Sequence, residues 1–100
     1  MHARVATFEG DPGETDRVVE EIRSRVEAGR ESPPEGMEGI TEMWMLVDRK
    51  TGKRLGITLY ETEEELHRGD EAMNAVTPPD TGGSRTSVSF YEVALHETRD

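Results

Sequence analysis

The chain has 100 residues, a formal net charge of −10 and no cysteine. This length allows one domain, residues 1–100, with a single core of a size at which oligomerisation often adds stability. The negative charge argues against nucleic acid or an anionic membrane as partner, because both are polyanions that bind clustered lysine and arginine. The absence of cysteine excludes disulfides and thiolate sites, and no apolar run resembles a signal peptide or a membrane span. A soluble cytoplasmic protein is therefore expected.

The first predicted elements are a strand over Ala3–Phe8 and a helix that ends at Gly29. The strand mixes β-branched and aromatic residues and stops at a cluster of turn residues that begins with Gly10. Asp11 is expected to cap the helix and Pro12 to occupy its first position. Apolar residues at helical spacing predict one buried stripe, formed by Val18, Val19, Ile22 and Val26.

Two apolar strands within Ile40–Tyr60 are predicted to form a hairpin. Asp48 would pair with Lys53 around a four-residue loop, with Gly52 in the left-handed conformation. Alternation then places one set of side chains on one face, namely Ile40, Glu42, Trp44, Leu46, Leu55, Ile57 and Leu59, and a second set on the other, namely Thr41, Met43, Met45, Val47, Gly56, Thr58 and Tyr60. Neither face is polar enough to meet water, and the chain's own helices can cover only one. The other face is expected to pack against a second copy of the chain.

The second helix is predicted to begin at a capping box formed by Thr62 and Glu65. Its packing face comprises Leu66, Gly69, Ala72, Met73 and Val76, and the pair Pro78 and Pro79 ends it. A final strand is expected over Thr86–Leu95. The resulting order, β-α-β-β-α-β, predicts an α+β, ferredoxin-like domain in which a four-stranded antiparallel sheet carries two helices on one face.

Three segments together resemble the antibiotic biosynthesis monooxygenase-like family of dimeric α+β barrels, over almost the whole chain. They are the hairpin Leu46–Lys53, the stretch Gly56–Glu64 that leads into the second helix, and the closing Phe90–Val93. In that family two ferredoxin-like subunits close their bare sheet faces against each other. The resemblance therefore implies a homodimer, and it implies fold more strongly than chemistry.

The activities that this resemblance implies are cofactor-independent oxidation of quinol-type aromatic substrates, haem binding or degradation, and isomerase or decarboxylase chemistry. Haem-degrading relatives use an Asn, a Trp and a His, at positions that align with Thr7, Gly69 and the Pro78–Pro79 region. The familiar haem residue set is therefore missing, and no cofactor is expected.

The candidate ligand-binding residues are Met43, Trp44, Met45, Thr58, Tyr60 and Tyr91. We assign the aliphatic side of the hairpin to the helices, so that the methionines, Thr58 and Tyr60 line a soft apolar pocket inside the barrel. Glu42 falls on that aliphatic side, which leaves the opposite assignment open. Trp44 and Tyr91 would orient a small apolar or aromatic ligand. The competing interpretations are a filled dimer core for the methionines, Thr58 and Tyr60, simple packing for Trp44, and a structural hydrogen bond for Tyr91.

No metal site is predicted. The terminal strands bring His2 and His96 toward each other, but no third ligand accompanies them. Catalytic residues cannot be assigned from the sequence. The leading interpretation is a small-molecule-binding barrel that resembles cofactor-independent monooxygenases, the alternative is a non-catalytic dimerisation or ligand-sequestering module, and haem binding ranks third.

Overall fold

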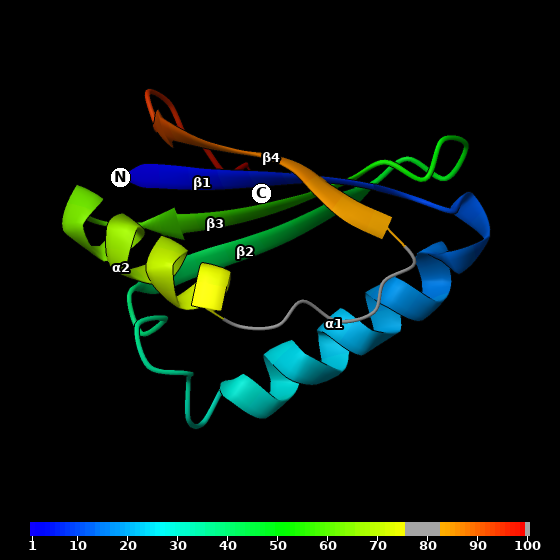
Figure 1. The fold of residues 1–100 in the computed structure, drawn as a ribbon. Coiled ribbons are helices and arrows are strands. Elements are labelled where there is room, and N and C mark those ends of the chain that lie inside the picture. Colours follow the sequence, from blue (N-terminus) through cyan, green and yellow to red (C-terminus); the bar gives the residue numbers. More distant parts are fainter. Residues whose placement is uncertain (76–82, 100) are drawn as a thin grey trace.

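The computed structural model describes residues 1–75 and 83–99 and contains one antiparallel sheet with strand order β2-β3-β1-β4 (Figure 1). In chain order the elements are β1 (His2–Gly10), the 3₁₀ helix η1 (Pro12–Glu14), α1 (Thr15–Gly29), β2 (Ile40–Val47), β3 (Arg54–Tyr60), α2 (Glu63–Ala75) and β4 (Gly83–Glu92). This arrangement confirms the predicted α+β, ferredoxin-like fold.

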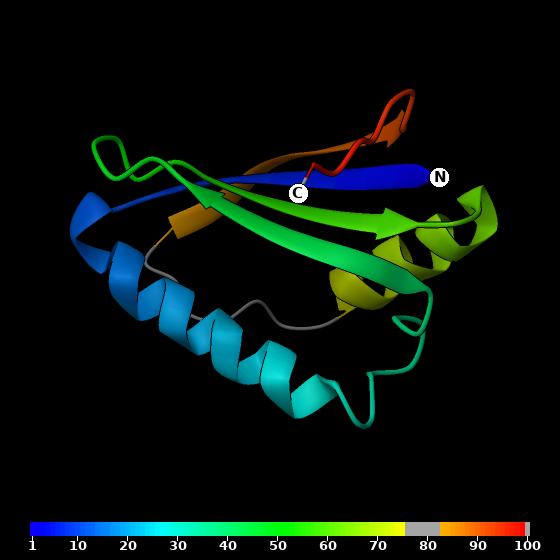
Figure 2. The same ribbon diagram turned by 180° about the vertical axis from the view of Figure 1, so that it is seen from behind.

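Helices α1 and α2 lie on the same side of the sheet, and the two views from front and back agree on this (Figures 1 and 2). The core between the layers includes Ala6 of β1, Val18 of α1 and Leu66 of α2, each at most 2% exposed. Among the described residues, no helix lies on the opposite side of the sheet. We call this side the open face.

The hairpin has the predicted register from Glu42 onward, whereas a shift between Ile40 and Glu42 pairs Ile40 with Tyr60 and moves it off the predicted face. Trp44 lies opposite Ile57 and Met43 opposite Thr58. The amide of Asp48 donates to the carbonyl of Lys53 over 2.8 Å, and Gly52 has a φ of 81°. A Cβ at Gly52 would also come within 2.9 Å of the Pro12 nitrogen, so the loop needs glycine for both conformation and space.

Both predicted helix starts are confirmed. The Asp11 side chain accepts a hydrogen bond from the Gly13 amide over 2.8 Å, although the first turn it caps is the 3₁₀ helix η1, which runs directly into α1. The Thr62 hydroxyl accepts from the Glu65 amide over 3.1 Å at the start of α2. The predicted helix end at Pro78 and Pro79, and the packing residue Val76, lie outside the described residues.

The assignment of the aliphatic hairpin side to the helices is wrong. Tyr60 of β3 packs directly against Gly69 of α2, and strand alternation therefore turns Thr58, Met43 and Met45 toward the helices as well. Leu55, Ile57 and Leu59 lie on the open face. The physical reason is that the polar side of the sheet finds its partners on α2, whereas Glu42 remains near solvent on the open face.

The last strand begins three residues before its predicted start and ends before Val93. Its register with β1 shifts between Thr7 and Phe8, so that Thr7 pairs with Ser87 and Phe8 with Arg85. The extra residue, Thr86, is accommodated as a bulge. An unshifted strand would have put Arg85 on the open face, and the bulge instead turns it toward the helices.

The open face is partly bare and partly covered by the C-terminal segment. Trp44, Leu46 and Tyr91 are 53%, 44% and 57% exposed, whereas Ala3 and Leu59 are only 7% exposed. The amide of Val93 donates to the Met1 carbonyl over 2.9 Å, and His96 lies 3.8 Å from the Glu42 carboxylate, so the segment after β4 passes over this end of the sheet (Figure 2).

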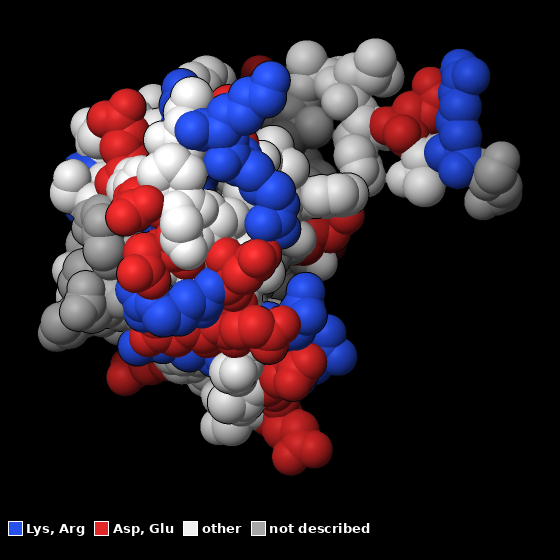
Figure 3. All heavy atoms as spheres, turned by 90° about the vertical axis from the view of Figure 1, so that its right-hand side faces the viewer, with Lys and Arg blue, Asp and Glu red and all other residues white. Residues whose placement is uncertain are grey.

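The outer surface of α1 interleaves charges of both signs, as the side view shows (Figure 3). Its arginines pair with glutamates one helical turn away, including Arg23 with Glu20 over 3.0 Å. Such an alternating surface gives no single-sign field for binding a polyelectrolyte. Within residues 1–75 and 83–99, no helix combines the length and apolarity needed to cross a membrane.

Candidate functional site

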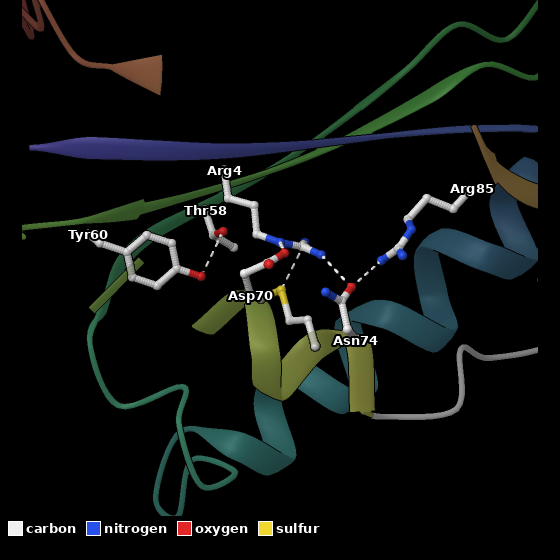
Figure 4. Close-up of polar contacts among 7 residues, drawn as sticks. Arg4, Thr58, Tyr60, Asp70, Asn74 and Arg85 are labelled. Atoms are coloured by element: carbon white, nitrogen blue, oxygen red, sulfur yellow. Dashed lines mark hydrogen bonds and ion pairs between the residues drawn. The ribbon is translucent and has the colours of Figure 1, made fainter. Parts of the chain in front are cut away.

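Polar side chains converge in the layer between the sheet and α2, on the side of the sheet that carries Tyr60 (Figure 4). We call this group the interlayer cluster, which comprises Arg4, Asp70, Met73, Asn74 and Arg85. Its acceptors come from positions 70, 73 and 74, which the helical repeat places on one face of α2. One arginine comes from β1 and the other from β4.

Arg4 is the centre of the cluster. It is 4% exposed, and its Nε donates to Asp70 Oδ1 over 2.8 Å. Nη1 lies 3.1 Å from the Met73 sulfur and Nη2 lies 3.5 Å from Asn74 Oδ1. Since a buried guanidinium is costly unless it is paired and hydrogen-bonded, α2 stabilises Arg4 along its whole planar group.

Asn74 connects Arg4 to the more exposed Arg85. Its Oδ1 also accepts a hydrogen bond from Arg85 Nη1 over 2.7 Å. A neutral amide oxygen between two cations does not cancel either charge. With Asp70 as the carboxylate of the cluster, two guanidinium charges face one negative charge, and the cluster is net cationic in a chain whose overall charge is −10.

Tyr60 lies beside the cluster and is fully buried. Its hydroxyl accepts a hydrogen bond from Thr58 Oγ1 over 3.0 Å. Burial raises the pKa of Tyr60 above its ordinary value of 10.0; the nearby Asp70 charge also raises it, while the Thr58 hydrogen bond and the Arg4 charge act in the opposite direction. The phenol is therefore neutral at physiological pH and keeps its proton.

Arg54 is a second buried arginine on the same side of the sheet, at the start of β3. It is 2% exposed, and its Nη2 donates to the Asp11 carbonyl over 3.1 Å. Its Nε and Nη1 have no hydrogen-bond partner within the described part of the chain. The hydroxyl of Thr15, which is 1% exposed, lacks one as well.

The six ligand-binding residues predicted from the sequence divide between the two faces. Thr58 and Tyr60 are in contact on the helix side, which they share with Met43 and Met45. Trp44 and Tyr91 lie on the open face, more than half exposed. The structure therefore does not bring all six into one site, and the pocket expected inside the barrel cannot be lined by the methionine side of the hairpin.

Sequence reasoning missed the arginines and their partners on α2. A signal was present in Arg4, which interrupts the apolar run of the first strand and shares its face with Ala6. A charge at such a position needs a carboxylate, and Asp70 lies one residue after the predicted packing position Gly69. Arg85 gave no such signal, because only the bulge places it on this face.

His2 and His96 do not meet. His2 pairs with Tyr60 across the sheet and shares its helix-facing side, whereas His96 approaches Glu42 on the open face. Within the described segments, no group of three or more His, Cys, Asp or Glu side chains is arranged to hold a metal ion.

Two shallow hollows lie outside the interlayer cluster. One, of about 150 Å³, is lined by the connection before β2 and by Glu65 and Arg68 of α2. The other, of about 230 Å³, lies at the hairpin end beside Leu46 and Leu55. Neither includes Tyr60 or the arginines of the cluster.

The structural relatives include haem-binding proteins. A search of solved structures matches the heme degrader MhuD from Mycobacterium tuberculosis with two hemes in its active site, at 16% identity and a TM-score of 0.72, over 98% of this chain and 100% of that chain. A mutant of MhuD with two manganese protoporphyrin IX molecules per active site matches at 15% identity and a TM-score of 0.71, over 99% and 100% of the two chains.

A third match is a protein from Deinococcus radiodurans named as a candidate antibiotic biosynthesis monooxygenase. It is 12% identical, with a TM-score of 0.62 over 100% of this chain and 99% of that chain. The chain has the fold of the antibiotic biosynthesis monooxygenase-like proteins. This confirms, at the level of the fold, the resemblance that the sequence predicted. No protein-family model and no curated protein matches the chain.

The described side chains do not fit a haem of the kind bound by these relatives. The ring of Tyr60 fills the space in front of Gly69, the position that aligns with the tryptophan of haem degraders. His67, the histidine of α2, packs edge-on against Phe90 with ring centroids 5.7 Å apart. Its imidazole is thus engaged by Phe90, the β4 residue that pairs with Arg4.

Proposed function

We propose that this protein is a cytoplasmic homodimeric α+β barrel that binds a small aromatic molecule and oxidises it with molecular oxygen without a cofactor. The observation that carries the proposal is the cationic interlayer cluster next to the neutral phenol of Tyr60. Phenols and quinols become easily oxidised when they lose a proton, and a guanidinium favours the resulting anion. The arginines of the cluster supply that positive charge.

In this reaction the substrate supplies all the electrons. One oxygen atom enters the substrate and the other leaves as water, so the protein needs no flavin or metal. The protein's contribution is to bind the ring, stabilise its anion and exclude water. Arg85 is the group placed to meet the substrate anion, since it is exposed whereas Arg4 is already paired with Asp70. Tyr60 holds its proton at the opposite end of the cluster, beside Thr58 (Figure 4).

The test is oxygen consumption by the purified protein with quinols and flavonoids. Binding can be followed in parallel by isothermal titration calorimetry. Substitution Arg85→Gln should lower the rate about tenfold or more if it stabilises the substrate anion. Arg23→Gln, on the outer surface of α1, is the matched control. Neither binding nor oxygen uptake with any of these compounds would contradict the proposal.

A non-catalytic dimerisation or ligand-sequestering module is the second candidate, and a specific observation favours it. Tyr60 is 0% exposed and Arg4 is 4% exposed, so the centre of the interlayer cluster is closed in the free chain. This candidate predicts a homodimer that binds aromatic compounds without consuming oxygen, or that binds none. Hemin mixed with the protein should leave its Soret band unshifted under either candidate, and a shift would contradict the poor fit described above.

A further inference from the structure

The Arg54 guanidinium is a buried cation without a counterion. It is 2% exposed, and the acceptor it has is the neutral carbonyl of Asp11. Two of its three nitrogens have no partner in the described structure, and the buried hydroxyl of Thr15, four residues after Asp11 at the start of α1, has none. Burying a charge is costly unless an opposite charge and hydrogen bonds compensate for it. The arrangement therefore calls for an anion with several acceptor atoms.

The elements around Arg54 do not supply this anion. The carboxylate that α2 turns toward the sheet, Asp70, is bound to Arg4. On α1, the Asp16 carboxylate pairs with Arg49 and is 84% exposed, and Glu20 and Glu21 pair with arginines of the same helix. The Asp11 carboxylate accepts from the Gly13 amide. No carboxylate of the described chain thus pairs with Arg54.

The sheet register places an aromatic ring between two arginines. Phe8 of β1 pairs with Arg54 on one side and with Arg85 on the other. All three face the helices, and for Arg85 this depends on the bulge at Thr86. On the β3 side the Phe8 ring lies over Gly56, where a Cβ would be at ordinary contact distance, 3.8 Å, from Phe8 Cε2, and the Phe8 side chain is half-buried.

Helix α1 covers this end of the layer with an apolar stripe that is only partly buried. Val18 of α1 is 1% exposed, but Val19, Ile22 and Val26 are only half-buried. An apolar ring between this stripe and Phe8 would gain contact area on both sides. The combination of a buried cation, a half-buried aromatic ring and a half-buried apolar stripe defines the chemistry of a ligand.

We propose that the layer at Arg54 binds a planar aromatic carboxylate, with the carboxylate on Arg54 and Thr15 and the ring against Phe8. The planar guanidinium matches the geometry of a carboxylate, and the Thr15 hydroxyl can donate to it. This inference deepens the proposed function, on which it rests for its biological role, by specifying that the substrate carries an acid group. The binding itself does not depend on oxidation.

The test is isothermal titration of the full chain with benzoate and salicylate, with benzamide and salicylamide as neutral counterparts and inorganic phosphate as an anion without a ring. We expect binding of the carboxylates and at least tenfold weaker binding of the amides and phosphate. In the NMR spectrum, the Arg54 Nε–H signal should shift on titration with benzoate. This readout needs no variant that could fail to fold.

The variants Arg54→Met and Arg54→Lys should each lose affinity for benzoate, by about 10- to 100-fold for the first, because a charge-assisted hydrogen bond is lost. Arg49→Gln, which removes an exposed arginine from the same end of the molecule, should bind as the wild type does. Equal binding of benzoate and benzamide, or an unmoved Arg54 signal, would overturn the inference. Oxygen uptake with neutral quinols is measured separately, so failure of the oxidase proposal is distinguishable from failure of this one.

Discussion

Tyr60 and Gly69 are in such close contact that a single methyl group would not fit between them. A Cβ at Gly69 would lie 2.7 Å from Cζ and Cε2 of the Tyr60 ring. The absence of a side chain at one position of α2 thus allows a strand tyrosine to pack directly on the helix backbone. This contact fixes which side of the sheet faces the helices, and with it the location of the arginines.

Gly69→Ala is therefore expected to destabilise the fold, although alanine is the better helix former. Overpacking of this kind costs about 1–3 kcal/mol. Urea denaturation measures the change in the free energy of unfolding. Gly29→Ala is the control, since a Cβ there meets its nearest atom, Pro34 Cδ, at 3.7 Å. If the two variants were equally stable, the close packing of Tyr60 on α2 would be refuted.

The ion pair between Arg4 and Asp70 should matter more than any surface pair. Its side chains are 5% and 19% exposed, and loss of Asp70 would leave an uncompensated guanidinium. Asp70→Ala should cost about 3 kcal/mol in the free energy of unfolding, and the double variant Arg4→Met with Asp70→Leu should be less destabilised than Asp70→Ala alone. Both are measured by chemical denaturation.

Glu20→Ala provides the comparison for this pair. Its partner is Arg23, and both side chains are more than 60% exposed. Exposed pairs of this kind contribute about 0–1 kcal/mol. Comparable losses for Asp70→Ala and Glu20→Ala would show that the interlayer pair has no special role.

The fold could be predicted because its signals are local. Gly52 identifies the turn, the Thr62 capping box identifies the start of α2, and alternation gives the two faces of the hairpin. Each of these signals depends on residues within a few positions of one another. They suffice for the order of elements and for the β2–β3 register.

The choice of hairpin face could not be predicted in the same way, because it depends on contacts between distant residues. Arg4 is 66 positions from Asp70, and Tyr60 reaches the helices only because position 69 is glycine. The aliphatic residues Leu55, Ile57 and Leu59 were expected to pack against the helices. The structure instead keeps them for the open face, which suits packing against another apolar surface.

The pH dependence of stability should show the burial of Tyr60. Its folded-state pKa is raised above the ordinary value of 10.0, so the unfolded chain releases this proton first as the pH rises. The stabilisation that arises from the raised pKa of Tyr60 is fully present below pH 10. It decreases as the pH rises from about 10 toward the folded-state pKa. Tyr60→Phe should remove this part of the slope.

The measurement for Tyr60 is urea denaturation between pH 8 and 11.5, with the difference between wild type and variant plotted against pH. The variant should be less stable below pH 10, by about 1 kcal/mol, because the Thr58 hydroxyl loses its acceptor. Above pH 10 the difference in the free energy of unfolding between wild type and variant should become smaller. Parallel curves would contradict a buried, proton-retaining phenol.

The open face predicts self-association. Trp44, Leu46 and Tyr91 leave a bare apolar surface on a small domain, and such surfaces are typical of interfaces. We expect the wild type to sediment as a dimer. Trp44→Glu should convert it to a monomer, because a carboxylate buried between two sheets would lack a partner.

Met43→Glu is the matched control for this prediction, since Met43 neighbours Trp44 on β2 with a similar exposure, 48% against 53%, but lies on the opposite face. It should remain dimeric in analytical ultracentrifugation. A wild type that stays monomeric at high micromolar concentration would contradict the barrel. Dissociation by Met43→Glu but not by Trp44→Glu would place the interface on the helix-facing side of the sheet and contradict the barrel.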